Sequence, residues 1–287
     1  MPAAKATLLI SCIDRPGVIA RVAGHLFDLD CNIITSDQYS DDEDGHFFWR
    51  IHFESKSRPF ADLARDLEAS FAGLRPWEQL RWSLHDAARR ERIVIMVSRL
   101  AHCMIDLLSR HHALELDADV VSVISNHPDL EPLARPFNVP FEVIAVPKGG
   151  KPAAEAALLK RLGELNADTV VLARYMQVLS GDFLRAWLKP IVNIHHSFLP
   201  AFAGSRPYQQ ARERGVKLIG ATAHYVTEEL DAGPIIAQAT TAITHRDSVA
   251  DLARKGKDLE VSVLAKAVRA HLNKQVLTHR NRTIVFE

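Results

Sequence analysis

Apolar and polar positions follow one pattern up to about residue 86 and another after residue 92. In the first part, short apolar runs predict four strands, and apolar side chains at helical spacing predict two helices. The strands are expected over 6–13, from 32, over 46–54 and over 78–85, and the helices over 18–30 and 60–71. The resulting order, β-α-β-β-α-β, is that of a ferredoxin-like fold.

After a charged connection, the pattern becomes a regular alternation of strands and helices. Strands are expected over 93–97, 119–125, 142–146 and 169–173, from 191, and over 217–226, 234–241 and 283–286. Helices are expected over 101–112, 152–165, 182–188 and 248–272. This alternation predicts a doubly wound, mostly parallel, Rossmann-like sheet. We therefore expect a first domain over 1–86, a linker over 87–91 and a second domain over 92–287.

The amino-acid composition of the chain argues against several classes of function. The chain has 287 residues, 47% of them hydrophobic and 24% charged, and its formal net charge is zero. Bulk charge therefore offers no attraction to nucleic acid or to an acidic membrane surface. The three cysteines, Cys12, Cys31 and Cys103, have no CxxC spacing, which favours a reducing compartment. The N-terminus lacks the apolar core of a signal peptide, and no run of about 18 apolar residues exists. We expect a cytoplasmic protein.

The candidate chemistry lies in the stretch from Ile191 to Gly204, where a short apolar strand ends in polar side chains. Ligands of open α/β sheets bind at the carboxyl ends of strands. Strand alternation predicts that Asn193 and His195 share one face and that His196 points to the other. Asp231 follows in the loop between two late strands. An amide donor, an imidazole and a carboxylate are each ordinary alone, but together they predict a catalytic site.

Two motifs carry a resemblance to the folate-dependent formyltransferase family. They are Asn-Ile-His-x-Ser-x-Leu-Pro-x-Phe-x-Gly from Asn193, and Asp-x-Gly-Pro-Ile-Ile-x-Gln from Asp231. The resemblance covers most of 92–287 and implies that Asn193, His195 and Asp231 are catalytic. It also implies a folate pocket lined by Arg174, Tyr175, Met176, Gln177, Val178, Leu179 and Val226. Because 10-formyltetrahydrofolate is then the substrate, no cofactor and no metal are expected.

The first domain resembles the ACT family, whose members often bind amino acids between two copies. The resemblance lies in the turn from Asp14 to Gly17, the helix after it, and the strand opening at Asn32 and Ile33. It implies Asp14, Gly17, Asn32 and Ile33 as candidate effector-binding residues. It also implies a homodimer or homotetramer. We further expect Asp14 to cap the helix that follows.

The segment from Val97 to Cys103 separates two possible reactions. Formyltransferases that make purine precursors hold a phosphorylated amine with a glycine-rich loop at this place, where backbone N–H groups contact phosphate. This segment contains no glycine, which argues against binding of a phosphorylated acceptor. If no amine is held, water is the remaining acceptor. Together with the ACT-like domain, this departure is similar to the formyltetrahydrofolate deformylase family. The resemblance implies hydrolysis to formate and tetrahydrofolate, which supplies formate for purine synthesis and balances one-carbon pools.

Three other hypotheses stay open at this point. One is a formyltransferase that uses an amine acceptor, and another is an inactive amino-acid sensor. The third is a metal hydrolase with ligands among His195, His196, His224 and Asp231. Against that one, adjacent strand residues point to opposite faces, and no HExxH pair exists. His102, in the glycine-free segment, is expected either to reach the pocket or to lie on a helix surface.

Overall fold

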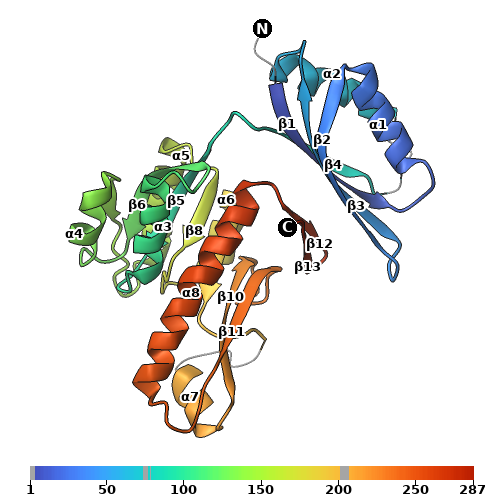
Figure 1. The fold of residues 1–287 in the computed structure, drawn as a ribbon. Coiled ribbons are helices and arrows are strands. Elements are labelled where there is room, and N and C mark those ends of the chain that lie inside the picture. The colour runs from blue at the N-terminus through green and yellow to red at the C-terminus, as the bar shows by residue number, and fades with distance from the viewer. Residues whose placement is uncertain (1–3, 74–76, 78, 201–206) are drawn as a thin grey trace. The chain divides into compact units, whose positions relative to one another are not determined.

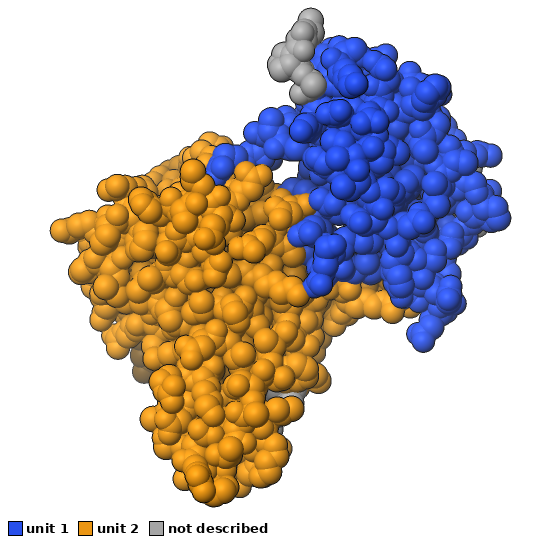
Figure 2. Space-filling model, in the orientation of Figure 1, with its two compact units in different colours: residues 1–90, 274–277, 284–287 blue, residues 91–273, 278–283 orange. Residues whose placement is uncertain are grey.

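The computed structural model describes residues 4–73, 77, 79–200 and 207–287. The chain forms two compact units, which Figure 2 colours separately. Unit 1 contains the chain up to Arg90 together with Lys274–Leu277 and Ile284–Glu287, and unit 2 contains Glu91–Asn273 and Thr278–Thr283. Each unit has its own sheet (Figure 1).

Unit 1 is a four-stranded antiparallel sheet with two helices, in the strand order β2-β3-β1-β4. Its elements are β1 (Ala4–Ile13), α1 (Val18–Asp28), β2 (Cys31–Asp41), β3 (His46–Ser55), α2 (Phe60–Ala72) and β4 (Arg81–Asp86). The predicted β-α-β-β-α-β order is therefore confirmed.

The core of unit 1 follows from the two periodicities in the sequence. Alternate residues of β3 point to one side of the sheet and join the same apolar cluster as the buried residues of α1 and α2. From β3 these are Phe47, Trp49, Ile51 and Phe53. Burying a large apolar side chain of this kind stabilises the fold by about 1.5–3 kcal/mol.

The predicted cap of α1 by Asp14 is wrong. Gly17 occupies the N-cap position with φ 92°, and no side chain caps the helix. The Asp14 side chain is exposed, and its backbone N–H donates to the Gly45 carbonyl at 2.8 Å. Side-chain capping requires the acidic residue at the N-cap itself, and the turn through Pro16 and Gly17 places the helix start three residues later.

Unit 2 contains a seven-stranded sheet in the order β11-β10-β9-β8-β5-β6-β7. Strands β5 to β9 run parallel, and β10 is antiparallel to β9 and to β11. The strands are β5 (Glu91–Val97), β6 (Ala118–Ser125), β7 (Phe141–Val143), β8 (Thr169–Leu172), β9 (Ile191–His195), β10 (Leu218–Tyr225) and β11 (Ile235–Ala242). The predicted mostly parallel, Rossmann-like sheet is confirmed.

The helices of unit 2 connect these strands. They are α3 (His102–His112), α4 (Glu131–Ala134), η1 (Arg135–Phe137), α5 (Lys151–Glu164), α6 (Gly181–Trp187), α7 (Pro207–Glu213) and α8 (Val249–Leu272). The pattern did not predict α4, η1 and α7, because such short segments contain too few residues to show a period. Residues of α5 and α6 bury an apolar core with β5, β6, β8 and β9.

Helix α8 packs against the sheet of unit 2 at strands β9, β10 and β11. It also contacts α3 (Figure 1). Its start is defined by a capping box in which Ser248 and Asp251 exchange side-chain and backbone hydrogen bonds. None of the described helices is long and apolar enough to cross a membrane.

The end of the chain differs from the single predicted strand. It forms a two-stranded hairpin of β12 (Val276–His279) and β13 (Arg282–Val285). Arg280 lies in its turn with φ 53°. The four-residue strand β12 is too short for its alternation to be distinguished from a polar loop.

Candidate active site

The strand β9 brings Asn193 and His195 to the carboxyl edge of the parallel sheet, as the pattern predicted. The antiparallel register of β9 and β10 places His224 directly opposite Asn193. Asn193 Nδ2 lies 3.1 Å from His224 Nε2, and His224 Nδ1 lies 2.9 Å from the Tyr225 carbonyl. Since a carbonyl accepts, His224 Nδ1 carries the proton and Nε2 accepts from the amide. Burial lowers the pKa of His224, which favours this neutral form.

Asp231 joins this pair from the loop between β10 and β11. Its Oδ1 lies 3.3 Å from His195 Nδ1 and 3.8 Å from His224 Nε2. The hydrogen bond from His195 holds the pKa of Asp231 below its ordinary value, so the carboxylate is charged at neutral pH. The structure thus brings Asn193, His195 and Asp231 together, although Asp231 is 36 residues beyond His195.

One atom of His195 stands apart from these contacts. The side chain is buried, and Nε2 has no hydrogen-bond partner among the described residues. Buried polar atoms nearly always have a partner, so such an atom in a cavity wall points to a ligand or a reacting molecule.

A glycine allows the loop to place Asp231. A Cβ at Gly233 would lie 1.9 Å from the Tyr225 carbonyl oxygen, so only a residue without a side chain fits there. The next residue, Pro234, accepts a hydrogen bond from the Tyr225 N–H at 2.9 Å. This close crossing turns the chain back, and Asp231 itself has φ 56°.

A cavity of about 500 Å³ lies in front of these side chains. Every predicted catalytic and folate-binding residue lines it: Asn193, His195, Asp231, Arg174, Tyr175, Met176, Gln177, Val178, Leu179 and Val226. Met176 and Val178 are 58% and 56% exposed, whereas Tyr175 and Leu179 pack against the core of unit 2. Exposed apolar side chains in a cavity wall are suited to the faces of a flat ring.

Comparisons with known proteins agree with this geometry. The Formyl transferase family model matches residues 91–268, and the ACT domain model matches residues 6–59. A formyltetrahydrofolate deformylase of Synechocystis sp. is 44% identical over 98% of this chain and 98% of its own. A second, from Mycobacterium bovis, is 47% identical over 97% of this chain and 90% of its own.

A solved structure extends the likeness to three dimensions. The crystal structure of a formyltetrahydrofolate deformylase from Pseudomonas syringae pv. tomato has a TM-score of 0.93 and 42% identity, and the match covers 99% of this chain and 95% of that one. The chain belongs to the formyltetrahydrofolate deformylase family. Its two units correspond to the two predicted resemblances, ACT and formyltransferase.

In this member of the deformylase family, the glycine-free segment supports the pocket. Ser98 follows β5, and its N–H donates to the Arg174 carbonyl at 3.2 Å. The Ser98 hydroxyl accepts from the Met176 N–H at 2.9 Å and donates to Asn126 Oδ1 at 2.7 Å. Sequence reasoning treated this segment as a missing phosphate loop and did not single out Ser98, which holds the wall of the cavity.

Two histidines lie elsewhere than predicted. His196 was expected on the face opposite His195, but its ring stacks on His195 with centroids 5.0 Å apart, and both line the cavity. The reason is that β9 ends at His195, so strand alternation no longer applies. His102 neither lines the cavity nor lies free on a helix surface, because its Nε2 is 2.7 Å from Glu260 Oε2.

The four residues considered above as metal ligands, His195, His196, His224 and Asp231, are not the group of close ligand atoms that the structure contains. Among the described residues, His102, Cys103 and Glu260 form the group whose ligand atoms lie within 4.8 Å of one another. Both carboxylate oxygens of Glu260 already accept hydrogen bonds, from His102 and Tyr208. Burial raises the pKa of the Cys103 thiol, which opposes the thiolate that binds metals. The donor set fits a protein hydrogen-bond cluster better than a metal site.

Two further residues hold the deformylase loop that follows His195. The Thr222 hydroxyl donates to the Ser197 carbonyl at 2.9 Å and accepts from the Leu199 N–H at 3.0 Å. Gln238 Nε2 donates to the Leu199 carbonyl at 3.0 Å. Gln238 is the last residue of the motif that begins at Asp231. Its fixed place in that motif is the sequence signal that could have identified it. Nothing in the local sequence indicated Thr222.

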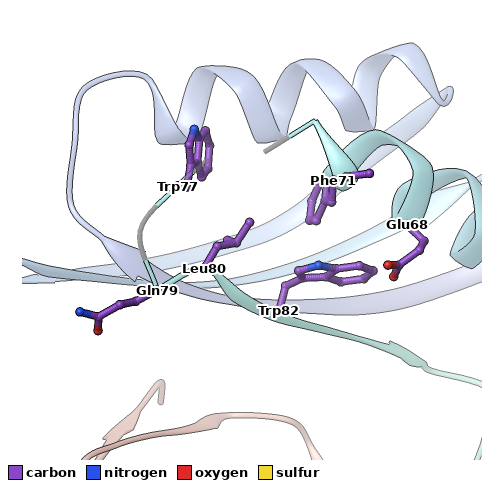
Figure 3. A pocket seen from close by; sticks show the side chains of 7 residues that line it. Glu68, Phe71, Trp77, Gln79, Leu80 and Trp82 are labelled. Carbon is purple, nitrogen blue, oxygen red and sulfur yellow. The ribbon is translucent and has the colours of Figure 1, made fainter. Parts of the chain in front are cut away.

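The predicted effector residues lie apart within one chain. Gly17 precedes α1, and Asn32 and Ile33 follow it in β2. The helix has 11 residues and is therefore about 16 Å long. Unit 1 also contains a cavity of about 320 Å³, lined by Glu68, Phe71, Ala72, Trp77, Gln79, Leu80 and Trp82 (Figure 3). None of the four predicted effector residues lines that cavity.

Proposed function

We propose that this protein hydrolyses 10-formyltetrahydrofolate to formate and tetrahydrofolate. The observation that carries the proposal is the unpartnered Nε2 of His195 in a cavity wall that also holds Asn193 and Asp231. Relatives that carry the deformylase name match almost the whole chain, both units included. This favours hydrolysis over transfer of the formyl group to an amine.

Asn193 has the role of oxyanion donor. Its amide carries two N–H bonds, and one of them is directed at His224 Nε2. The other is then available to the oxygen of the formyl group as water adds to its carbon. Because His224 is neutral and its Nδ1 proton is bound to a carbonyl, the orientation of the amide is set before substrate arrives. A donor of this kind contributes roughly 10²–10³ in rate.

His195 and Asp231 move the proton. The charged Asp231 accepts from His195 Nδ1, which leaves the lone pair of Nε2 directed away from the carboxylate. Nε2 takes a proton from the attacking water as the new C–O bond forms. The same proton passes to N10 as the C–N bond breaks, so that formate and tetrahydrofolate leave. Acid–base help of this kind contributes about 10²–10⁴-fold.

The folate itself is held beside these groups. Met176 and Val178 offer apolar surface to the pterin ring, and the half-buried Tyr175, Leu179 and Val226 complete the apolar wall. Arg174 and Gln177 add polar groups at its edge. The substrate carries its own one-carbon group, so the reaction as written calls for no cofactor.

In this proposal, unit 1 regulates the hydrolysis by binding an amino acid. Gly17 and Asn32 lie at opposite ends of α1, so an amino acid that touches both needs two copies of the chain. We therefore place the effector at an interface within a homodimer or homotetramer. The edge strand β2 pairs only with β3 among the described residues, which leaves its other side available to a second copy.

The setting of the reaction is also part of the proposal. Cys12, Cys31 and Cys103 are all free thiols, which supports a cytoplasmic protein. The formate would enter purine synthesis, and the hydrolysis would balance one-carbon pools.

The test is release of formate from 10-formyltetrahydrofolate by chelator-treated protein with no amine present. We expect steady turnover with equal amounts of formate and tetrahydrofolate, because water is the acceptor. If the protein is silent without an amine but active with one, it is a transferase and the proposal is wrong.

A further inference from the structure

A buried carboxylate lies behind the candidate active site. Glu260 of α8 is 2% exposed. Its Oε2 lies 2.7 Å from His102 Nε2, and its Oε1 accepts from the Tyr208 hydroxyl at 3.1 Å. Arg174 Nε is 3.4 Å from Oε2, within ion-pair range although not aligned for a hydrogen bond. Burial raises the pKa of Glu260. The hydrogen bond from His102 and the charge of Arg174 together lower it by more, so the pKa of Glu260 lies below its ordinary value.

The space for this cluster is built into α8. A Cβ at Gly256, one turn before Glu260, would lie 1.9 Å from the Tyr208 hydroxyl oxygen. A glycine in the middle of a 24-residue helix costs about 0.5–1 kcal/mol relative to alanine. Here it allows Tyr208 to reach the carboxylate.

Arg174 connects the carboxylate to the cavity. Its Nη1 lies 2.6 Å from His196 Nδ1. A guanidinium only donates, so Nδ1 accepts and the His196 proton sits on Nε2. Arg174 has φ 66°, a conformation uncommon for residues other than glycine, and the hydrogen bond from the Ser98 N–H to its carbonyl holds it there.

His196, which contacts Arg174, also packs against His195. The two rings are stacked, with centroids 5.0 Å apart and planes inclined by 25°. Burial and the Arg174 charge lower the pKa of His196 to about 4. A neutral ring therefore lies against His195. This matters because His195 becomes cationic when it takes the proton of water, and a second cation beside it would oppose that step.

We propose that Glu260 is a positioning residue for the hydrolysis: it anchors Arg174, which orients a neutral His196, whose ring sets the plane of His195. This inference rests on the proposed function. Without the carboxylate, Arg174 would be a buried cation without its counter-ion. Its charge would then raise the electrostatic potential at His195 and His196.

The pH dependence involves the charged and titratable groups that interact with the two rings. From the elements packed against them these are His224 of β10, Asp231 of the β10–β11 loop, Arg174 after β8, Tyr208 of α7 and Glu260 of α8. Glu228 and Glu229 line the same cavity as the two rings. In wild type, the charges of Glu260 and Asp231 raise the pKa of His196, against burial and the Arg174 charge, which lower it. Removing the Glu260 charge must therefore lower the pKa of His196 further.

The test compares Glu260→Gln with Asp258→Asn, an exposed acid two residues earlier on the same helix. For Glu260→Gln we expect kcat to fall about 10²-fold through misplacement of His195, with KM close to wild type. The acidic limb of the kcat–pH profile should move to lower pH. Asp258→Asn should match wild type in kcat, in KM and in the position of that limb.

Imidazole titration by NMR tests the inference without turnover. The His196 signal should titrate at lower pH in Glu260→Gln than in wild type, because Glu260 raises its pKa. If wild type releases no formate, the proposed function fails, while these titrations still judge the role of Glu260. If Glu260→Gln does not fold, Arg174→Lys should show the same loss of kcat, because lysine cannot contact both Glu260 and His196. A wild-type kcat in the variant, or a lower kcat with unmoved pH limb and titrations, would overturn the inference.

Discussion

At the scale of single residues, hydrogen bonds within the protein determine which nitrogen of His224 and of His195 carries the proton, and how the Asn193 amide is oriented. The Tyr225 carbonyl fixes the proton of His224, and His224 then orients the amide of Asn193. On the other side, Asp231 fixes the proton of His195 on Nδ1. Asn193 and His195, the proposed donor and base, thus each have one polar group held by the protein and another left for the substrate. A preorganised site of this kind does not need to reorient as charge develops.

Separate replacement of the three residues tests these roles. We expect kcat to fall roughly 10²–10³-fold in Asn193→Ala, which loses the oxyanion donor. It should fall about 10²–10⁴-fold in His195→Ala and in Asp231→Asn, which lose proton transfer or its orientation. Steady-state formate release is the measurement, with Asp129→Asn, an exposed acid in the same unit, as control. A folded variant with near wild-type turnover would refute the role assigned to that residue.

At the scale of elements, the hairpin of β10 and β11 determines whether the carboxylate reaches the imidazole. Its β10 strand carries Thr222 and His224, its loop carries Asp231, and its β11 strand carries Gln238. The loop closes only because Gly233 passes against the Tyr225 carbonyl. The hairpin therefore sets the geometry of residues from both of its strands and from the loop between them.

Replacement of Gly233 by alanine tests whether the geometry of this loop positions Asp231. In Gly233→Ala the added Cβ would meet the Tyr225 carbonyl, so we expect the loop to shift and kcat to fall about 10²-fold. The control is Gly163→Ala in α5, where a Cβ meets nothing within 4 Å. That variant should keep wild-type kcat and gain about 0.5–1 kcal/mol in unfolding free energy. Equal kcat in the two variants would show that Gly233 does not position Asp231.

At the scale of the whole molecule, both ends of the chain contribute to unit 1. Arg50 Nε donates to the Lys274 carbonyl at 3.0 Å, and the Phe286 N–H donates to the Gln275 carbonyl at 2.8 Å. A fragment that ends at residue 86 would lack these C-terminal segments. Effector binding is therefore better measured on the full chain than on an isolated N-terminal fragment.

Calorimetric titration of the full chain with single amino acids tests the role of unit 1. We expect at least one of them to bind, and Asn32→Ala to weaken that binding, with Gln38→Ala on the same strand as control. Sedimentation should give a dimer or tetramer, because Gly17 and Asn32 of one chain lie at opposite ends of α1. No binding by any amino acid would refute the effector role, and a monomer would refute the shared site.

Most of the fold and the main site residues were predictable because their signals are local. Apolar periods of 2 and 3.6 residues indicated the main strands and helices, and Gly-Pro turns indicated where they end. The predictions that were wrong share a cause. The opposite orientation of His196 assumed that a strand continues past His195, and the Asp14 cap assumed a helix start three residues too early. Element ends depend on one or two hydrogen bonds, which a periodic pattern does not specify.

The sequence by itself determined the order of the main elements, the family, and the candidate site at the carboxyl edge of a parallel sheet. These depend on side-chain periodicity and on motifs of neighbouring residues. Only the tertiary structure decided that Glu260 lies behind the site, because it contacts His102 across 158 residues through the packing of α3 on α8. It also decided that His224 faces Asn193, because that pairing depends on the register of two strands. Partners brought together by packing and register have no fixed spacing in the sequence, so no local pattern can indicate them.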